Sequence, residues 1–218
     1  MKAQGATSVE KLFSVSSGPL ALTPNCCPAM LDLFPLGSDL FRTLQQRNGF
    51  YAFESALHVF PIAASDCMSL EEWNATSLWR DTYKYLANDL LFFAEDAFQN
   101  QFALSATGVV RFESETAEKR LLANSIENWA AIILRDHRTE TGWPLIQEWQ
   151  DLNGPLAPGK WLMPNTPFFL GGEFSLSNLL AGDSVEGMRY KGDLAIQTRG
   201  LPDGAAIRLV VGKPPLTQ

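Results

Sequence analysis

Two residue types that build many catalytic and metal sites are scarce in this chain of 218 residues. It has two histidines, His58 and His137, and three cysteines, Cys26, Cys27 and Cys67. Without a cluster of His, Cys and Asp at ligand spacing, the sequence predicts no metal site. An odd number of cysteines with two adjacent members makes no disulfide framework, so we expect reduced thiols, as in a cytosolic protein.

Motifs for nucleotide cofactors and for serine hydrolases are absent as well. Neither G-x-S-x-G nor G-x-G-x-x-G occurs, and Gly171-Gly172 is not part of a phosphate loop ending in Gly-Lys-Ser/Thr. Cys26-Cys27 lacks the C-x-x-C spacing that activates a thiol at a helix N-terminus. We therefore expect no cofactor and no catalytic residue of these classes.

Long apolar runs are also missing. None reaches the roughly 18 residues that a membrane helix needs, so we expect no contact with a membrane. Residues 1–17 carry Lys2 and Lys11 but no continuous apolar segment, so the sequence predicts no secretory signal and a cytoplasmic protein. A hydrophobic fraction of 46% and a charged fraction of 19% are typical of a globular chain that buries its own core.

The net charge of −7 is concentrated in one part of the chain. Residues 69–118 hold nine acidic and three basic residues, and so carry −6 of that charge. This sign argues against DNA or RNA as a direct partner. An acidic face attracts basic proteins and speeds their association. The alternative is a solvated surface that keeps the protein soluble.

The most informative segment, residues 89–112, has the pattern of three strands joined by two short turns. An apolar run leads to the acidic pair Glu95-Asp96, and the first turn follows. Adjacent residues in a strand point to opposite faces, so the two carboxylates cannot share one substrate atom unless a bulge intervenes. We expect one of them to hold the turn, with Asn100 rather than Gln99 at the position of positive φ.

Helical signals lie on both sides of this segment. Ser69-x-x-Glu72 is a capping box that opens a short helix, and Asn48-Gly49 has the form of a helix C-terminus. Elsewhere, apolar residues recur at helical spacing. We predict helices within residues 28–48, from residue 69, over residues 76–86, 124–136 and 144–152, and near 177–180, with one strand or two over residues 50–61.

The last part of the chain gives fewer signals. A Pro/Gly-rich loop over residues 153–167 marks the best internal boundary. Two strands, over residues 188–198 and 206–211, are expected to form a hairpin around Leu201-Pro202-Asp203-Gly204. The sequence thus predicts an α+β protein with a mainly antiparallel sheet, helices packed on one side and a C-terminal hairpin extension.

The order of these elements over residues 33–136 resembles the SUKH superfamily. The resemblance rests on a Pro-led helix, on the strands after it and on five short motifs, although the family usually has Gly where Gln99 stands. These motifs are Asn48-Gly49, the run from Phe93 to Phe98, Asn100-Gln101-Phe102, Gly108-Val109-Val110, and Ser125-Ile126-Glu127-Asn128-Trp129. We accordingly divide the chain into a loosely attached arm (1–27), a SUKH-like core (28–137) and an extension (138–218) packed on that core.

The resemblance implies a protein that acts without catalysis. Bacterial members bind a cognate secreted toxin and block it, and a fungal relative regulates cell-wall synthesis. We expect an immunity protein against a toxin, such as a nuclease, delivered by a contact-dependent or type VI-like system. The alternatives are a regulatory or scaffold module of the same fold and, from another class, an enzyme that uses Glu95 or Asp96 with His58.

A toxin that handles nucleic acid presents a basic cleft, which an acidic surface complements. The candidate toxin-binding residues are therefore acids of the charged segment, namely Glu71, Glu72, Asp81, Glu95, Asp96, Glu113 and Glu115. The sequence gives no oligomeric state.

Overall fold

The centre of the protein is a six-stranded antiparallel sheet in which each strand pairs with its neighbours in the sequence, in the order β1–β2–β3–β4–β5–β6. The computed structural model describes residues 5–157, 159–202, 204–205 and 207. Its sheet strands are β1 (Phe50–Ala52), β2 (Leu57–Val59), β3 (Leu91–Asp96), β4 (Gln101–Ser105), β5 (Gly108–Phe112) and β6 (Lys119–Ala123). The α+β class and the three strands of residues 89–112 are confirmed, whereas β6 was not predicted.

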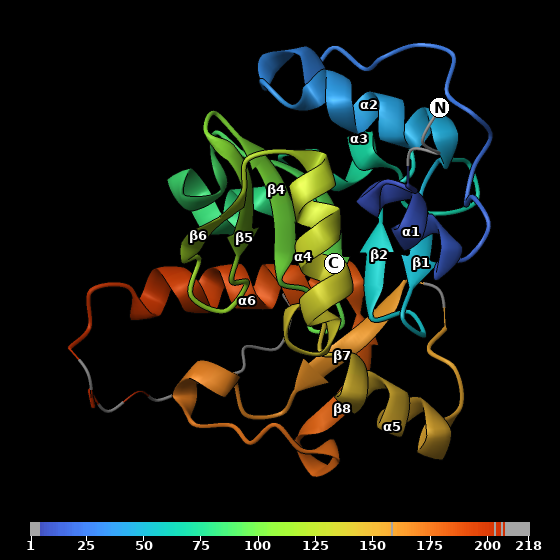
Figure 1. Ribbon diagram of the computed structural model, residues 1–218. Helices are drawn as coiled ribbons and strands as arrows, with labels where there is room; N and C mark the ends of the chain where they lie inside the picture. The colour runs from blue at the N-terminus through green and yellow to red at the C-terminus, as the bar shows by residue number, and fades with distance from the viewer. Residues whose placement is uncertain (1–4, 158, 203, 206, 208–218) are drawn as a thin grey trace.

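Helices cover both faces of this sheet (Figure 1), so the expectation that they pack on one side is wrong. On one face lies α4 (Ile126–Glu140), whose Trp129 ring is 5.0 Å from that of Phe93. On the other face, the ring of Trp79, just before the 3₁₀ helix η2 (Arg80–Ala87), is 5.0 Å from that of Phe92. Strand β3 is buried at every position, and a strand that is buried on both faces needs cover on both.

The N-terminal region is docked on the core. Helix α1 (Ser8–Ser14) begins with a capping box between Thr7 and Glu10, and its Val9 and Leu12 are buried beside α4. Residues 1–27 therefore contain a packed helix rather than a wholly loose arm. The 3₁₀ helix η1 (Leu31–Leu33) and helices α2 (Gly37–Gln46) and α3 (Leu70–Trp73) complete this end of the molecule.

The C-terminal part places its hairpin elsewhere than predicted. Helix α5 (Trp143–Asn153) is followed by β7 (Lys160–Pro164), the 3₁₀ helices η3 (Phe168–Leu170) and η4 (Leu176–Asn178), β8 (Leu179–Asp183) and α6 (Ser184–Thr198). The hairpin is formed by β7 and β8. In Figure 1 it lies with α5 at the lower end of the sheet, and α6 runs across the picture at the lower ends of β5 and β6.

The predicted strand over residues 188–198 is wrong, because this segment lies in α6. Asp183 caps the helix by accepting from the N–H groups of Val185 and Glu186, a start signal that the alternating pattern concealed. Gly192 lets α6 approach η2, since a Cβ there would lie 2.2 Å from Thr82 Oγ1. The other predicted strand, residues 206–211, falls almost wholly outside the described residues.

A second, smaller apolar cluster joins this C-terminal part to the sheet. It contains Phe98 from the β3–β4 turn, Ile146 of α5, Leu162 of β7 and Leu179 of β8. The extension therefore packs on the core, and the β3–β4 turn is the point where the two meet. No helix in the described part of the chain has both the length and the apolar character that crossing a bilayer requires.

Candidate functional site

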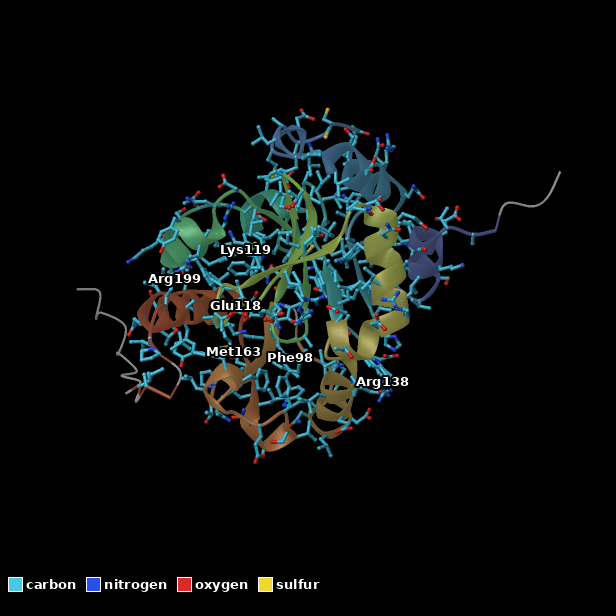
Figure 2. The ribbon with its side chains drawn as sticks, turned by 60° about the vertical axis from the view of Figure 1, so that its left-hand side comes forward. Phe98, Glu118, Lys119, Arg138, Met163 and Arg199 are labelled. Atoms are coloured by element: carbon cyan, nitrogen blue, oxygen red, sulfur yellow. The ribbon has the colours of Figure 1, made fainter. Side chains whose placement is uncertain are left out.

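A cleft of about 760 Å³ opens where the end of the sheet meets the C-terminal part. Its floor comes from the β3–β4 turn and β5, one side from the end of α4 and the start of α5, and another from the segment around η3. Figure 2 shows Phe98 between Glu118 and Arg138, three of the lining residues. Pockets of this volume suit small ligands or single side chains.

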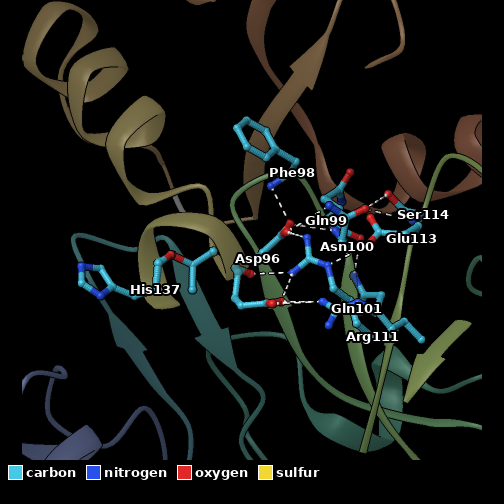
Figure 3. Close-up of polar contacts among 12 residues, drawn as sticks. Asp96, Phe98, Gln99, Asn100, Gln101, Arg111, Glu113, Ser114 and His137 are labelled. Atoms are coloured by element: carbon cyan, nitrogen blue, oxygen red, sulfur yellow. Dashed lines mark hydrogen bonds and ion pairs between the residues drawn. The ribbon is translucent and has the colours of Figure 1, made fainter. Parts of the chain in front are cut away.

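The floor of the cleft is built on Asp96, which holds the β3–β4 turn. Its Oδ1 accepts hydrogen bonds from the backbone N–H groups of Phe98 (2.9 Å) and Asn100 (2.8 Å), as Figure 3 shows. Asn100 Oδ1 in turn accepts from the backbone N–H of Ser114. The prediction that one acid of the pair forms the turn is confirmed. The positive φ, 66°, is at Gln99 and not at Asn100, so the expectation that Asn100 takes this position is wrong.

Arg111 lies beside Asp96 with every side of its guanidinium engaged. It donates to Asp96 Oδ2 (2.7 Å), to Glu113 Oε1 (2.7 Å) and to the backbone oxygen of Glu140 (2.6 Å). Burial alone would lower the pKa of Arg111, but the charges of Asp96, Glu113 and Glu140 outweigh it and raise that pKa above its usual value. This arginine is therefore fully paired, and it offers little charge to a ligand.

The turn is also held from the side of α6. Lys191, which is 2% exposed, donates from Nζ to the backbone oxygen of Phe98, and Gln99 Nε2 donates to the backbone oxygen of Ser184 (2.7 Å). Burial lowers the pKa of Lys191, while the nearby carboxylate of Glu115 opposes that shift. With Asp96 on one side and α6 on the other, the turn is a rigid support for the cleft.

Aromatic rings form the wall opposite the acidic floor. Phe168 and Phe174 stack with ring centroids 3.9 Å apart and planes 5° from parallel, and the edge of Phe98 meets Phe168 at 5.2 Å. Phe174 is nevertheless 69% exposed. An exposed aromatic ring at the mouth of a cleft is a common anchor for a binding partner.

Carboxylates outnumber cations among the lining residues. Two arginines line the cleft, Arg111 and Arg138, and the latter lies over the ring of Trp143 at 5.1 Å. The lining also contains five acids: Asp96, Glu113, Glu115, Glu118 and Glu148. Burial raises the pKa of Glu115, although Lys191 and the Phe169 N–H act in the opposite direction. Glu118 and Glu148 are exposed.

The other acid of the pair, Glu95, belongs to a closed polar cluster on the opposite face of the sheet. Its Oε1 is 3.1 Å from His58 Nδ1, and its Oε2 accepts from Gln101 Nε2, whose own Oε1 accepts from the indole of Trp73. His58 is 4% exposed, and its ring stacks on that of Tyr51 at 4.5 Å, with the ring of Trp161 at 5.9 Å. The structure thus joins His58 to Glu95 and separates both from Asp96, and side chains would have to move before a substrate reached the pair.

The candidate toxin-binding acids fall into three groups. The cleft brings together Asp96, Glu113 and Glu115, whereas Glu71, Glu72 and Asp81 lie on α3 and η2, away from its lining. Glu95 and Asp96 are each 1% exposed and both are used in internal hydrogen bonds, so neither carboxylate lies at the surface, and a direct contact of these two with a partner stays a prediction. Glu115 is 9% exposed and lines the cleft.

Sequence reasoning missed the aromatic wall and the acids outside the predicted set. A signal existed, because the Gly-rich loop PFFLGGEF over residues 167–174 contains three phenylalanines without helix or strand periodicity. Such a density in a loop indicates a local cluster or an exposed contact. Among the described residues, no group of three or more His, Cys, Asp or Glu side chains is arranged to hold a metal ion.

Comparison with known proteins identifies a fold and no family. No protein-family model matches the sequence, and no curated protein matches it. Among solved structures, the crystal structure of Atu4351 from Agrobacterium tumefaciens matches with a TM-score of 0.60 and 11% sequence identity, covering 84% of this chain and 88% of that chain. At that identity the likeness shows the fold alone, and the fold is the α+β arrangement described above.

Proposed function

We propose that this protein is a non-catalytic immunity protein that acts in the cytoplasm by binding and neutralising a cognate secreted bacterial toxin. The observation that carries the proposal is the cleft, which combines an exposed aromatic wall with an excess of carboxylates on a rigid turn. Binding sites between proteins are built from such anchored aromatic residues inside a charged rim. The order of elements that resembles the SUKH superfamily supports the same function.

The charge of the cleft favours a basic partner. Of its two arginines, Arg111 is paired with three acids, whereas Arg138 is exposed and lies over the ring of Trp143, so the five acids of the lining leave the cleft with an excess of negative charge. The exposed carboxylates of Glu118 and Glu148 stay available to a partner. A nuclease binds the phosphates of its substrate with Lys and Arg, so a nuclease is the class of toxin that this surface fits best.

Co-expression tests the proposal directly. The toxin encoded beside this gene is produced in a sensitive strain with the wild-type protein, with Phe174→Ala, or with Asp81→Asn as a matched variant outside the cleft. We expect growth with wild type and Asp81→Asn, reduced growth with Phe174→Ala, and a complex on co-purification. No rescue of growth together with no complex would contradict the proposal.

A regulatory or scaffold module of the same fold remains the alternative. It predicts several unrelated partners in a pull-down and no toxin gene next to this one. An immunity protein predicts one dominant partner of basic character. The same pull-down, made with wild type and with Phe174→Ala, distinguishes the two functions. Only the immunity function predicts a single partner that binds wild type and no longer binds Phe174→Ala.

A further inference from the structure

We propose that the cleft binds an arginine side chain of the partner, which stacks on the aromatic wall and pairs with carboxylates of the same cleft. This inference rests on the proposed function in taking the cleft as the surface that meets the partner. It adds the chemical group that the cleft recognises. Three observations carry it: the rings, the unpaired acids and the excess of those acids over free cations in the cleft lining.

The rings offer a flat surface to a planar cation. Phe168 and Phe174 are stacked on each other, and Phe98 meets both at its edge, with centroid distances of 5.2 and 6.2 Å. Phe174 keeps 69% of its surface exposed although it lines the cleft. A guanidinium group stacks on an aromatic face by cation–π attraction and stays planar against it, which an ammonium group does not do.

A buried carboxylate without an ion pair faces the same space. Glu115 lines the cleft and is 9% exposed, and its Oε2 accepts from the backbone N–H of Phe169 at 3.1 Å. No Lys or Arg nitrogen of the described residues lies within 4.0 Å of its oxygens. Lys191 acts on this carboxylate only from beyond that distance. A buried carboxylate without a direct ion pair is unfavourable, so an incoming cation that pairs with it recovers free energy.

Unpaired acids outnumber free cations in the cleft lining, which disfavours an anion as the ligand. Arg111 is saturated by Asp96, Glu113 and Glu140, and the exposed Arg138, which lies over Trp143, faces three acids without an ion pair among the described residues, Glu115, Glu118 and Glu148. A phosphate or a partner carboxylate would therefore meet like charge. Arginine is also the group that pairs with a carboxylate through two parallel hydrogen bonds. A cleft of about 760 Å³ has room for this side chain and part of its backbone.

A capped tripeptide tests the inference without any toxin. Acetyl-Gly-Arg-Gly-amide is titrated into the ¹⁵N-labelled full chain, beside the same peptide with lysine and with citrulline, the uncharged isostere of arginine. We expect amide shifts confined to residues 113–118 and 168–174, binding about threefold weaker for lysine, and binding at least about tenfold weaker for citrulline. Equal binding of arginine and citrulline, or shifts spread over the surface, would overturn the inference.

Two variants and a control locate the group in the cleft. Phe174→Ala and Glu115→Gln are each expected to weaken the arginine peptide about fivefold, while Asp81→Asn, an exposed acid outside the cleft, leaves the affinity unchanged. Circular dichroism melting of each variant checks its fold, and Phe174 is exposed enough that its removal leaves the core intact. An unchanged affinity in both folded cleft variants would also overturn the inference.

The outcomes separate this inference from the proposed function. If the peptide binds in the cleft but the neighbouring toxin is neither bound nor neutralised, the immunity function fails and arginine recognition stands. If the toxin is neutralised but the peptide does not distinguish arginine from citrulline, the immunity function stands and arginine recognition fails.

Discussion

Glu95 and Asp96 are neighbours in the sequence, equally buried, and placed in opposite environments. Glu95 points into a closed cluster with stacked aromatic rings, and its hydrogen-bond partners are the imidazole of His58 and the amide of Gln101. Asp96 points to the other face, pairs with Arg111 and holds the turn beneath an open cleft. A pair of carboxylates that resembles a catalytic dyad in the sequence is therefore divided by the sheet into a core residue and a scaffold residue.

This difference shows why charge alone did not identify the proposed binding surface. The buried acids of the meander serve the fold, and we propose that a partner meets the exposed acids around them. Each experiment below changes one side of this division and compares it with the other, starting from the largest expected effect.

Replacing Arg111 removes the cation on which the cleft floor depends. In Arg111→Met, Asp96 stays buried and loses its cation, while Glu140 keeps only Arg120, so we expect the free energy of unfolding to fall by about 3–5 kcal/mol. Arg120→Met, which removes a cation from Glu140 at a half-exposed position, is expected to cost no more than about 1 kcal/mol. Urea unfolding of both variants measures the difference, and equal losses would contradict the account.

The two acids themselves give the sharpest comparison. Asp96→Asn places an amide beside Arg111 and Asn100, and we expect a loss of about 2–3 kcal/mol because a charged hydrogen-bond acceptor is removed. Glu95→Gln keeps an oxygen for Gln101 and is expected to cost about 1 kcal/mol. The midpoints of urea unfolding, compared at the same dependence of the free energy on urea concentration, test which variant loses more stability. A larger loss of stability for Glu95→Gln would contradict the account, because the more important charge would then be that of Glu95 and not that of Asp96.

Gly192→Ala tests how tightly α6 supports the cleft turn. The added Cβ would lie 2.2 Å from Thr82 Oγ1 and 2.8 Å from the ring of Tyr83, so α6 must shift. We expect a loss of about 1–3 kcal/mol in urea unfolding. Gly200→Ala serves as a matched control in open space, although its positive φ of 80° adds backbone strain of about 1 kcal/mol. A neutral Gly192→Ala would show that α6 is loosely packed.

Replacing Glu115 is expected to have the smallest effect on stability, and the direction of that change, a gain or a loss, is what the experiment tests. Burial raises its pKa in the folded state, so the protonated form is favoured by folding, and this stabilisation is lost as pH rises through the folded pKa. Glu115→Gln mimics the protonated form, so at pH 7 we expect a gain of less than about 1 kcal/mol that disappears at low pH. Thermal melts at both pH values measure it. A loss of stability at pH 7 would show that the carboxylate is paired.

Much of the fold followed from local patterns, whereas the site did not. The meander was predictable because its apolar runs and turns are adjacent in the sequence, and the Ser69–Glu72 capping box is present as expected. The helix over residues 184–198 was missed because its buried face includes Gly187, Lys191 and Gly192, residues that no apolar periodicity marks. The cleft joins residues 96–118 to residues 168–174 through the chain's tertiary packing, and a pattern within either segment cannot show that contact.

The central claim is that the partner binds at the cleft and not at the acidic surface in general. Its most direct test is the affinity of the toxin encoded beside this gene, measured by titration calorimetry for wild type, for Phe174→Ala combined with Glu118→Gln, and for Asp81→Asn. The account predicts at least about a tenfold loss for the cleft variant and, for Asp81→Asn, no more than about a twofold loss. Unchanged affinity in the cleft variant, with a large loss in Asp81→Asn, would contradict it.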